Sequence, residues 1–272
     1  MLVQASQLIK NINRLKRDNH STDAAPIQIE AIFTRKKKDI VAAQKLRYRV
    51  FTEEYGAKIR SVRGIDKDRY DKYCLHLIVK DTCSNEVIGY TRVLTHSAAR
   101  ITNGFYSSSE FDLTNILNHV NQEKGGRIIE IGRTCIDSRY RNGGTIGTLW
   151  AAIGQYLQDN HVRFLIGCAS ISMSDGGGAA HSIMEKIRQK HLTESNLRVT
   201  PHKGLHVLNP KIQTSPKIPP LLKAYLGMGA KIAGEPYWDI DFNVADVFIF
   251  LDMNNVSHRY KKHFLRNTSK QQ

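Results

Sequence analysis

The sequence predicts an α/β domain built on a mixed, mainly antiparallel sheet, with one central parallel pair of strands and helices on both faces. Two apolar runs rich in β-branched residues, at 128–137 and 164–171, predict buried strands. Between them, apolar residues recur at helical spacing over 146–157. Strand, helix and strand in this order give two parallel strands joined by a right-handed crossover, which we take as the centre of the fold.

The remaining elements surround this unit. Further strands are expected at residues 27–34, 75–81, 86–95 and 244–251. Further helices are expected at residues 36–51, 111–120, 179–190 and 219–228. Residues 193–217 show no periodicity that assigns an element. We therefore expect one domain over residues 28–265, a basic N-terminal extension at 1–27 and a short basic tail at 266–272.

The charge balance indicates an acidic partner. The formal net charge is +15, from 40 Lys and Arg against 25 Asp and Glu. Such a charge favours nucleic acid, an anionic membrane or an acidic protein, unless it is only a solvated basic surface. The basic residues form no helix-turn-helix, zinc-finger or RRM pattern, so nucleic acid is disfavoured.

Cysteine and histidine spacing predicts neither a disulfide framework nor a metal site. The four cysteines form no C-x-x-C, and the histidines form no H-E-x-x-H. No apolar run has the length of a transmembrane helix, and no signal peptide is evident. We expect a cytoplasmic protein. Residues 1–27 could form a basic amphipathic helix on the inner membrane, pack on the domain or stay disordered.

One carboxylate stands inside the first strand of the central unit. Glu130 lies between apolar neighbours, where loss of hydration should raise the pKa of its carboxyl and make it a better base near neutral pH. The alternative is a buried ion pair with Arg133 or another arginine.

A basic, glycine-containing turn follows that strand at residues 138–145. It contains Arg139, Arg141, Gly143 and Gly144 at an expected helix N-terminus. Backbone N–H groups and the positive end of the helix dipole at such a position suit a phosphate. The alternative is an ordinary loop with two solvated arginines.

The order of elements, with a basic glycine turn after the fourth strand, resembles the GCN5-related N-acetyltransferase (GNAT) fold. In that fold the fourth and fifth strands splay apart. The turn after the fourth holds the pyrophosphate of coenzyme A or the phosphate of a phosphopantetheine arm. The family pattern Arg/Gln-x-x-Gly-x-Gly/Ala can be aligned from Arg139 or from Arg141, which leaves open the arginine that meets the phosphate.

Several motifs are similar to the branch that contains acyl-homoserine-lactone synthases and ornithine lipid acyltransferases. Shared with the whole branch are an Arg-x-x-x-Phe at 47–51, an Asp-x-x-Asp at 68–71, a strand arginine at 92 and a Glu-x-x-Arg at 130–133. Four further stretches resemble the ornithine lipid enzymes, at residues 105–113, 167–170, 219–226 and 241–248.

This resemblance implies an N-acyltransferase. The implied donor is a fatty acyl group, typically 3-hydroxyacyl, on the phosphopantetheine of an acidic acyl carrier protein, with a coenzyme A thioester as the alternative. The implied acceptor is L-ornithine and the product lyso-ornithine lipid, with no tightly bound cofactor and no metal.

The resemblance also assigns residues. Glu130 becomes the catalytic base, and Tyr225 is a candidate acid for the leaving group or a core residue. The substrate-binding candidates, which could instead form ion pairs that shape the pocket, are Arg47, Asp68, Asp71, Arg92 and Arg133. The phosphopantetheine-binding candidates are Arg139, Arg141, Gly143 and Gly144.

Two other functions remain open. The same fold could acylate another amino acid, giving N-acyl amino acids or an acyl-homoserine lactone. Alternatively, the chain could be a non-catalytic protein that binds a polyanion or an anionic membrane, which would not need Glu130.

Overall fold

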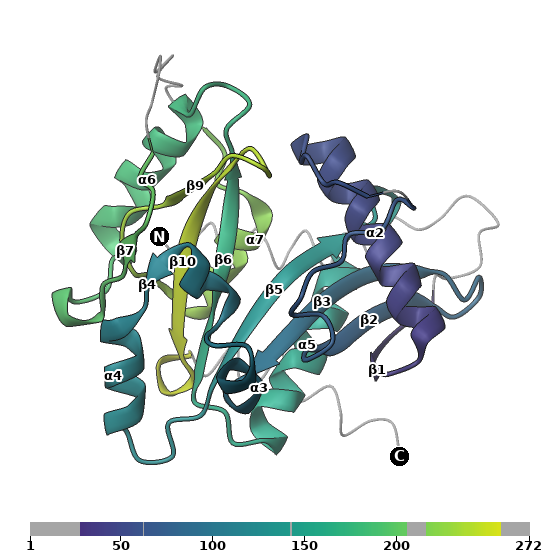
Figure 1. Ribbon diagram of the computed structural model, residues 1–272, viewed down its shortest axis with the longest axis horizontal. Helices are drawn as coiled ribbons and strands as arrows, with labels where there is room; N and C mark the ends of the chain where they lie inside the picture. The colour runs from purple at the N-terminus through teal and green to yellow at the C-terminus, as the bar shows by residue number, and fades with distance from the viewer. Residues whose placement is uncertain (1–27, 62, 142, 206–215, 257–272) are drawn as a thin grey trace, which may run out of the picture.

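The computed structural model describes residues 28–61, 63–141, 143–205 and 216–256, so the expected extension at 1–27 and tail at 266–272 lie outside the described residues. Eight strands form one sheet in the order β1-β2-β3-β5-β6-β10-β8, with β9 paired to β10 (Figure 1). Among the named strands of the described residues, β5 and β6 form the one parallel pair and the other pairs are antiparallel, which confirms the predicted fold class. The strands are β1 (Ile29–Thr34), β2 (Leu75–Asp81), β3 (Val87–Thr95), β5 (Ile128–Ile136), β6 (Phe164–Ser172), β8 (Lys231–Ile232), β9 (Tyr237–Asp239) and β10 (Val244–Asp252).

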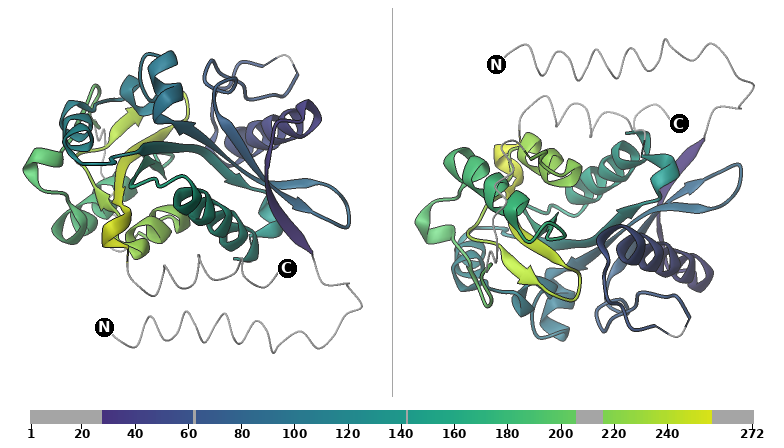
Figure 2. Two further views of the ribbon diagram at one scale, coloured as in Figure 1. Left: turned by 90° about the horizontal axis from the view of Figure 1, so that it is seen from below. Right: turned by 90° about the horizontal axis from the view of Figure 1, so that it is seen from above.

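Helices cover both faces of this sheet (Figure 2). On one face, α5 (Gly144–Asp159), α6 (Gly178–His191) and α7 (Pro220–Met228) bury their apolar sides against the strands. On the other face lie α2 (Lys37–Tyr55), α3 (His96–Ile101) and α4 (Thr114–Gln122). Two apolar layers therefore clamp the sheet, and the strand residues alternate between them as the pleat requires.

The expected helix at 111–120 is wrong at its start. Residues Phe111–Asp112 form a short strand, β4, which pairs with β7 (Thr200–Pro201) in a second, two-stranded sheet. The Asp112 carboxylate accepts hydrogen bonds from the backbone N–H and hydroxyl of Thr114. This local bond competes with helix formation at Asp112, and α4 begins at Thr114. Helix α3 and the strands β4, β7, β8 and β9 have no counterpart in the sequence prediction.

The parallel strands β5 and β6 separate after four paired positions. Ile128–Ile131 pair with residues 164–167, and beyond Gly167 the two strands diverge (Figure 1). A Cβ atom on Gly167 would lie 2.4 Å from the carbonyl oxygen of Ile131, so only glycine allows the strands to approach at this last pair. The opening between β5 and β6 therefore begins next to the closely packed Ile131–Gly167 pair.

None of the helices in the described residues is long and apolar enough to cross a membrane.

Candidate active site

Glu130 lies on β5 beside the start of this opening. It pairs with Ile166, one position before the last pair, and is 4% exposed. Its Oε2 accepts a hydrogen bond of 2.6 Å from the backbone N–H of Tyr106, and its Oε1 accepts one of 2.9 Å from Ser107. Burial raises the pKa of the Glu130 carboxyl, and the hydrogen bonds from Ser107 and Tyr106 offset part of this rise.

The carboxylate of Glu130 therefore holds the first turn of a short 3-10 helix, η1 (Tyr106–Ser109). Each oxygen retains a second lone pair that can take a proton. In the described part of the chain no ion pair joins Glu130 to an arginine, so the alternative of a structural pair with Arg133 is wrong. Glu130 can both position η1 and act as a base.

Arg133 has a backbone conformation that is unusual inside a strand. Its φ is 55°, and the pairing of β5 with β3 shifts at this point, because Arg92 pairs with Gly132 and Tyr90 with Cys135. One extra residue is thus accommodated as a β-bulge, a device that redirects side chains near active sites. The bulge places the Arg133 guanidinium 4.8 Å from the ring centre of Tyr106 and 4.6 Å from that of Phe242.

Three arginines, of which Arg47 and Arg92 are buried, form an ion-pair network with three aspartates on the α2, β3 and β5 side of the opening. Arg47 lies 2.8 Å from Asp66 and 2.7 Å from Asp71. Arg92 lies 2.7 Å from Asp68 and 3.1 Å from Asp71. Arg133 lies 3.3 Å from Asp66 and 3.5 Å from Asp68. We call these six residues the arginine network. Its three positive charges equal its three negative charges in number.

This pairing keeps the network ionised. Burial alone would raise the pKa of Asp68, but the hydrogen bond and charge of Arg92 outweigh it and hold that pKa at about 2. Burial likewise opposes ionisation of Asp71, and the charges of Arg47 and Arg92 lower its pKa in spite of it. The structure thus brings all five predicted substrate-binding residues together, in the ion pairs expected as the alternative. Direct contact with a substrate stays a prediction.

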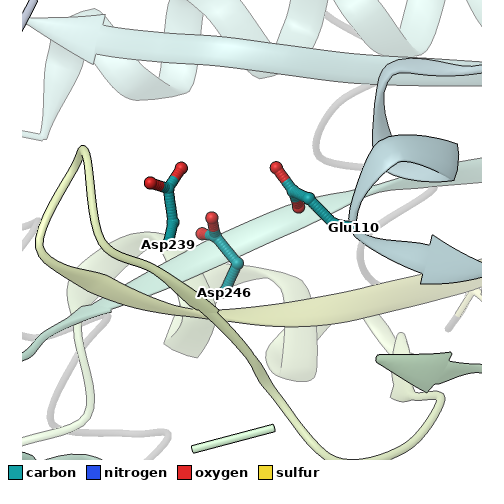
Figure 3. Close-up of side chains that lie close together, drawn as sticks. All are labelled: Glu110, Asp239 and Asp246. Carbon is teal, nitrogen blue, oxygen red and sulfur yellow. The ribbon is translucent and has the colours of Figure 1, made fainter. Parts of the chain in front are cut away.

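Three more carboxylates gather on the β6 and β10 side of the opening. Glu110 follows η1, Asp239 ends β9 and Asp246 lies within β10. One carboxylate oxygen from each lies within 4.8 Å of the others, and the groups point toward a common space (Figure 3). The Ser170 hydroxyl donates a 2.6 Å hydrogen bond to Asp246, and the Cys168 thiol lies 3.4 Å from Glu110. These three residues, here called the acidic cluster, are also a group that could hold a metal ion.

The acidic cluster lacks the compensation that the arginine network has. Among the described residues no lysine, arginine or histidine forms an ion pair with any of its members. Burial and the neighbouring Asp246 and Asp239 raise the pKa of Glu110 well above its usual value. Burial and the charge of Asp239 raise the pKa of Asp246 to about 6. The Ser170 hydrogen bond and the charge of Arg133 offset only part of this rise in pKa. The cluster therefore favours protonation or a bound cation.

The basic turn precedes α5 as expected. Gly143 has a φ of 91° and occupies the N-cap, and Gly144 is the first residue of the helix. Arg139 lies 2.7 Å from Glu86 and 2.8 Å from Asp137, while Arg141 lies 2.6 Å from Glu54. Both arginines are about half exposed, at 58% and 43% of the side chain, so an anion could exchange with these carboxylates. Binding of a phosphate by these four residues stays a prediction.

Tyr225 on α7 lies in the core formed by α5, α6 and α7. Its ring meets that of Trp150 edge-on at 5.1 Å between centres, and 1% of the residue is exposed. Burial, followed by the charges of Cys168 and Glu130, raises the pKa of its hydroxyl. The structure supports the core role, and an acid role stays a prediction.

The acidic cluster is the feature that the sequence analysis did not identify. Asp246 is a carboxylate inside a nearly continuous apolar strand, the same signal that drew attention to Glu130. That signal could have found it. Glu110 and Asp239 carry no such signal, because short strands and turns surround them.

Comparison with known proteins agrees with this architecture. Residues 46–151 match the family model for the acetyltransferase (GNAT) domain. L-ornithine N(alpha)-acyltransferase of Brucella abortus is 31% identical over 254 residues, covering 87% of this chain and 88% of that protein. The Rhizobium meliloti enzyme of the same name is 29% identical over 251 residues, covering 87% and 84%.

A solved structure shares the fold. FeeM, an N-acyl amino acid synthase from uncultured soil microbes, superposes with a TM-score of 0.52 at 11% identity, covering 84% of this chain and 93% of FeeM. Together, the mixed sheet with its separating parallel pair, the GNAT match and the extent of the curated similarity show that the chain is an acyltransferase and belongs to the L-ornithine N(alpha)-acyltransferase family.

Proposed function

We propose that this protein transfers a fatty acyl group, typically 3-hydroxyacyl, from acyl carrier protein to the α-amine of L-ornithine, giving lyso-ornithine lipid. The observation that carries the proposal is Glu130, a buried carboxylate of raised pKa at the point where β5 and β6 separate. The names of the curated relatives support ornithine as acceptor.

The chemistry requires a neutral amine. The α-ammonium of the acceptor gives a proton to Glu130, directly or through a water, and the freed nitrogen attacks the thioester carbonyl. The carbon–nitrogen bond forms and the carbon–sulfur bond breaks. The attached nitrogen also loses a second proton. Of the two protons, one ends on the departing thiolate, by way of Glu130 or Tyr225, and the other passes to solvent. Backbone N–H groups along the opening are the candidate donors to the oxyanion of the tetrahedral intermediate.

The donor would be held by its phosphate and by its carrier. Arg139, Arg141, Gly143 and Gly144 at the N-terminus of α5 suit the phosphopantetheine phosphate. The net charge of +15 favours association with an acidic carrier protein, at a rate that falls as salt increases. A coenzyme A thioester carries the same phosphopantetheine arm and is the alternative donor. We propose a donor that binds and leaves in each turnover, with no tightly held cofactor.

The basic extension at 1–27 also favours peripheral contact of this cytoplasmic enzyme with the anionic inner membrane, which the lipid product would join. Co-sedimentation of the full chain and of a chain lacking residues 1–27 with anionic vesicles checks this point. Equal binding by both would remove the extension from membrane contact.

The test of the proposal is acyl transfer by the purified protein. Acyl carrier protein and coenzyme A thioesters are offered with L-ornithine, and products are identified by mass spectrometry. We expect N-acyl ornithine, formed faster from the carrier protein. Glu130→Gln should lower kcat by about 10²-fold or more. Glu185→Gln, at a glutamate with a 61% exposed side chain, is the matched control.

A pH profile separates a base from a positioning group. Glutamine at position 130 can accept only one of the two backbone hydrogen bonds, so η1 is also disturbed. If Glu130 takes the proton, the defect shrinks as pH rises above the pKa of the acceptor α-ammonium. A defect that is constant with pH would remove Glu130 from proton transfer. Acylation of a different amino acid would replace ornithine, and binding of polyanions without any acyl transfer would contradict the enzyme.

A further inference from the structure

The acidic cluster places buried negative charge across the β5–β6 opening from the arginine network. Glu110 is 4% exposed and Asp246 is 6% exposed. Their partners are a thiol, Cys168, and a hydroxyl, Ser170, which do not neutralise a carboxylate. A buried carboxylate without a cation is costly, so this arrangement favours a positive ligand.

Glu110 is the observation that points to a ligand. It comes from the segment after η1, far in sequence from β9 and β10, yet its carboxylate is aimed at the space shared with Asp239 and Asp246 (Figure 3). Its Oε2 meets only the Cys168 thiol, and its Oε1 accepts no hydrogen bond from the described residues. An apolar or amide side chain would be less costly here if the position served packing alone.

The spacing suits an ammonium group. A tetrahedral ammonium that donates three hydrogen bonds of about 2.8 Å has its acceptors about 4.6 Å apart. The nearest oxygens of the three carboxylates all lie within 4.8 Å of one another. The three N–H donors of one ammonium could therefore each meet a different carboxylate.

The cluster suits an ammonium that stays charged throughout the reaction. Carboxylates stabilise the charged form of an amine and oppose its deprotonation. The attacking α-amine must lose a proton, so it belongs near the single carboxylate Glu130. A second, non-reacting amine belongs near several carboxylates. Glu130 accepts hydrogen bonds from the N-terminal end of η1, and Glu110 follows its C-terminal end, so one four-residue turn links the proposed base to the acidic cluster.

The geometry points to Glu110, Asp239 and Asp246 as the subsite that holds the side-chain ammonium of a diamino acid acceptor and so selects it over mono-amino acids. This inference rests on the amino acid acylation proposed above. It assigns acceptor selection to residues distinct from the proposed base and from the arginine network.

The experiment compares L-ornithine with L-norvaline, which has the same carbon chain without the terminal amine. Acyl transfer is measured for the full-length protein and for Asp246→Asn and Glu110→Gln. Asp241→Asn is the matched control, since Asp241 is exposed on the same β9–β10 loop and outside the cluster. We expect the native protein to prefer ornithine in kcat/KM by about 10²-fold or more. Each cluster variant should lower this preference at least tenfold, mainly through KM, while the control keeps it.

Three outcomes would overturn the assignment. The first is a native protein that uses both acceptors equally. The second is a cluster variant that loses activity with both acceptors in the same proportion, because a purely structural role would act in this way. The third is activity that depends on added Mg²⁺, Mn²⁺ or Ca²⁺ and is abolished by a chelator, since the cluster would then be a metal site.

Ornithine binding without a donor separates this inference from the proposed function. Calorimetry of the donor-free protein should show that ornithine binds more tightly than norvaline. Asp246→Asn should weaken the binding of ornithine. Such binding without any acyl transfer would keep the subsite and reject the proposed reaction. Acyl transfer with ornithine binding no better than norvaline would reject the subsite and keep the reaction.

Discussion

The arginine network and the acidic cluster each contain three aspartate or glutamate carboxylates on the same face of one sheet, yet they are electrostatically opposite. In the network, Arg47, Arg92 and Arg133 hold the pKa of Asp68 at about 2. In the cluster, burial raises the pKa of Asp246 to about 6. The difference comes from the neighbours, since both sets of carboxylates are largely buried. The charges of the arginine network are balanced within the protein. The carboxylates of the acidic cluster are balanced by a positive ligand or by a proton.

We expect the largest loss of stability when one member of the arginine network is removed. Arg47 is fully buried, and Arg47→Met leaves Asp66 and Asp71 without this partner. We expect a loss of about 3–5 kcal/mol in the free energy of unfolding, the usual effect of removing one side of a buried pair. Urea unfolding measures it. In the control, Arg188→Met breaks an exposed pair with Glu235 and should cost about 0.5 kcal/mol or less. Equal losses of unfolding free energy for Arg47→Met and Arg188→Met would contradict the difference between buried and exposed ion pairs.

The cluster should respond in the opposite direction. Without acceptor, Asp246→Asn removes a buried charge that has no direct ion pair among the described residues, and it keeps an acceptor atom for Ser170. At pH 7 we expect the free energy of unfolding to rise by about 1–2 kcal/mol, because a pKa near 6 in place of about 4 corresponds to at most about 3 kcal/mol. Thermal or urea unfolding of the ligand-free protein checks this. A clear loss of stability would mean that Asp246 is already paired in the native state.

The pH dependence sharpens the same contrast. Because the folded-state pKa of Asp246 is raised, its penalty is absent below the unfolded pKa of about 4, grows as pH rises from there, and is complete above the folded pKa of about 6. The stability gain of Asp246→Asn over the native protein should therefore fall by about half between pH 7.5 and pH 5 and vanish below about pH 4. Paired unfolding curves at each pH isolate this effect from the histidines. The network contributes little in this window, since Asp68 titrates near pH 2.

The smallest effect on stability is expected at the basic turn. Arg139 pairs with Glu86 and Asp137 at the surface, where solvent screens the interaction. Arg139→Gln should leave the unfolding midpoint unchanged and raise the KM for the acyl donor, measured by steady-state acyl transfer. An unchanged KM would move the phosphate contact to Arg141 or away from this turn.

The sequence predicts the fold well because its main elements are long and periodic. The strands at 75–81 and 164–171 and the helices at 146–157 and 179–190 agree with the structure within two residues. Short strands such as β4 and β9 escape prediction, since two or three residues cannot show a period. The partner of β4 is also distant in sequence, whereas β9 pairs with the adjacent β10. The predicted helix at 111–120 is wrong only at its start, where Phe111 and Asp112 pair with β7 and α4 begins at Thr114.

The candidate site is only partly visible in the sequence. Glu130 stands out among isoleucines, and the Asp68 and Asp71 motif marks the loop that meets the arginines. The sequence does not show which arginine forms an ion pair with which aspartate. Simple alternation would direct Arg133 to the same face as Ile131, and the bulge reverses this. The acidic cluster depends on three segments that only tertiary folding brings together.

The bulge at Arg133 also sets a rule for changes in chain length. Gly132 and Cys135 face the same side of β5 although they are three positions apart, an odd number, so the alternation of the side chains between the two faces shifts by one residue between them. Deleting one residue between Gly132 and Cys135 would restore regular alternation of the side chains. Either Glu130 or the β5 residues after Arg133 would then point to the opposite face of the sheet. Relatives that keep both the glutamate and the basic turn should therefore tolerate substitutions here far more readily than single-residue insertions or deletions.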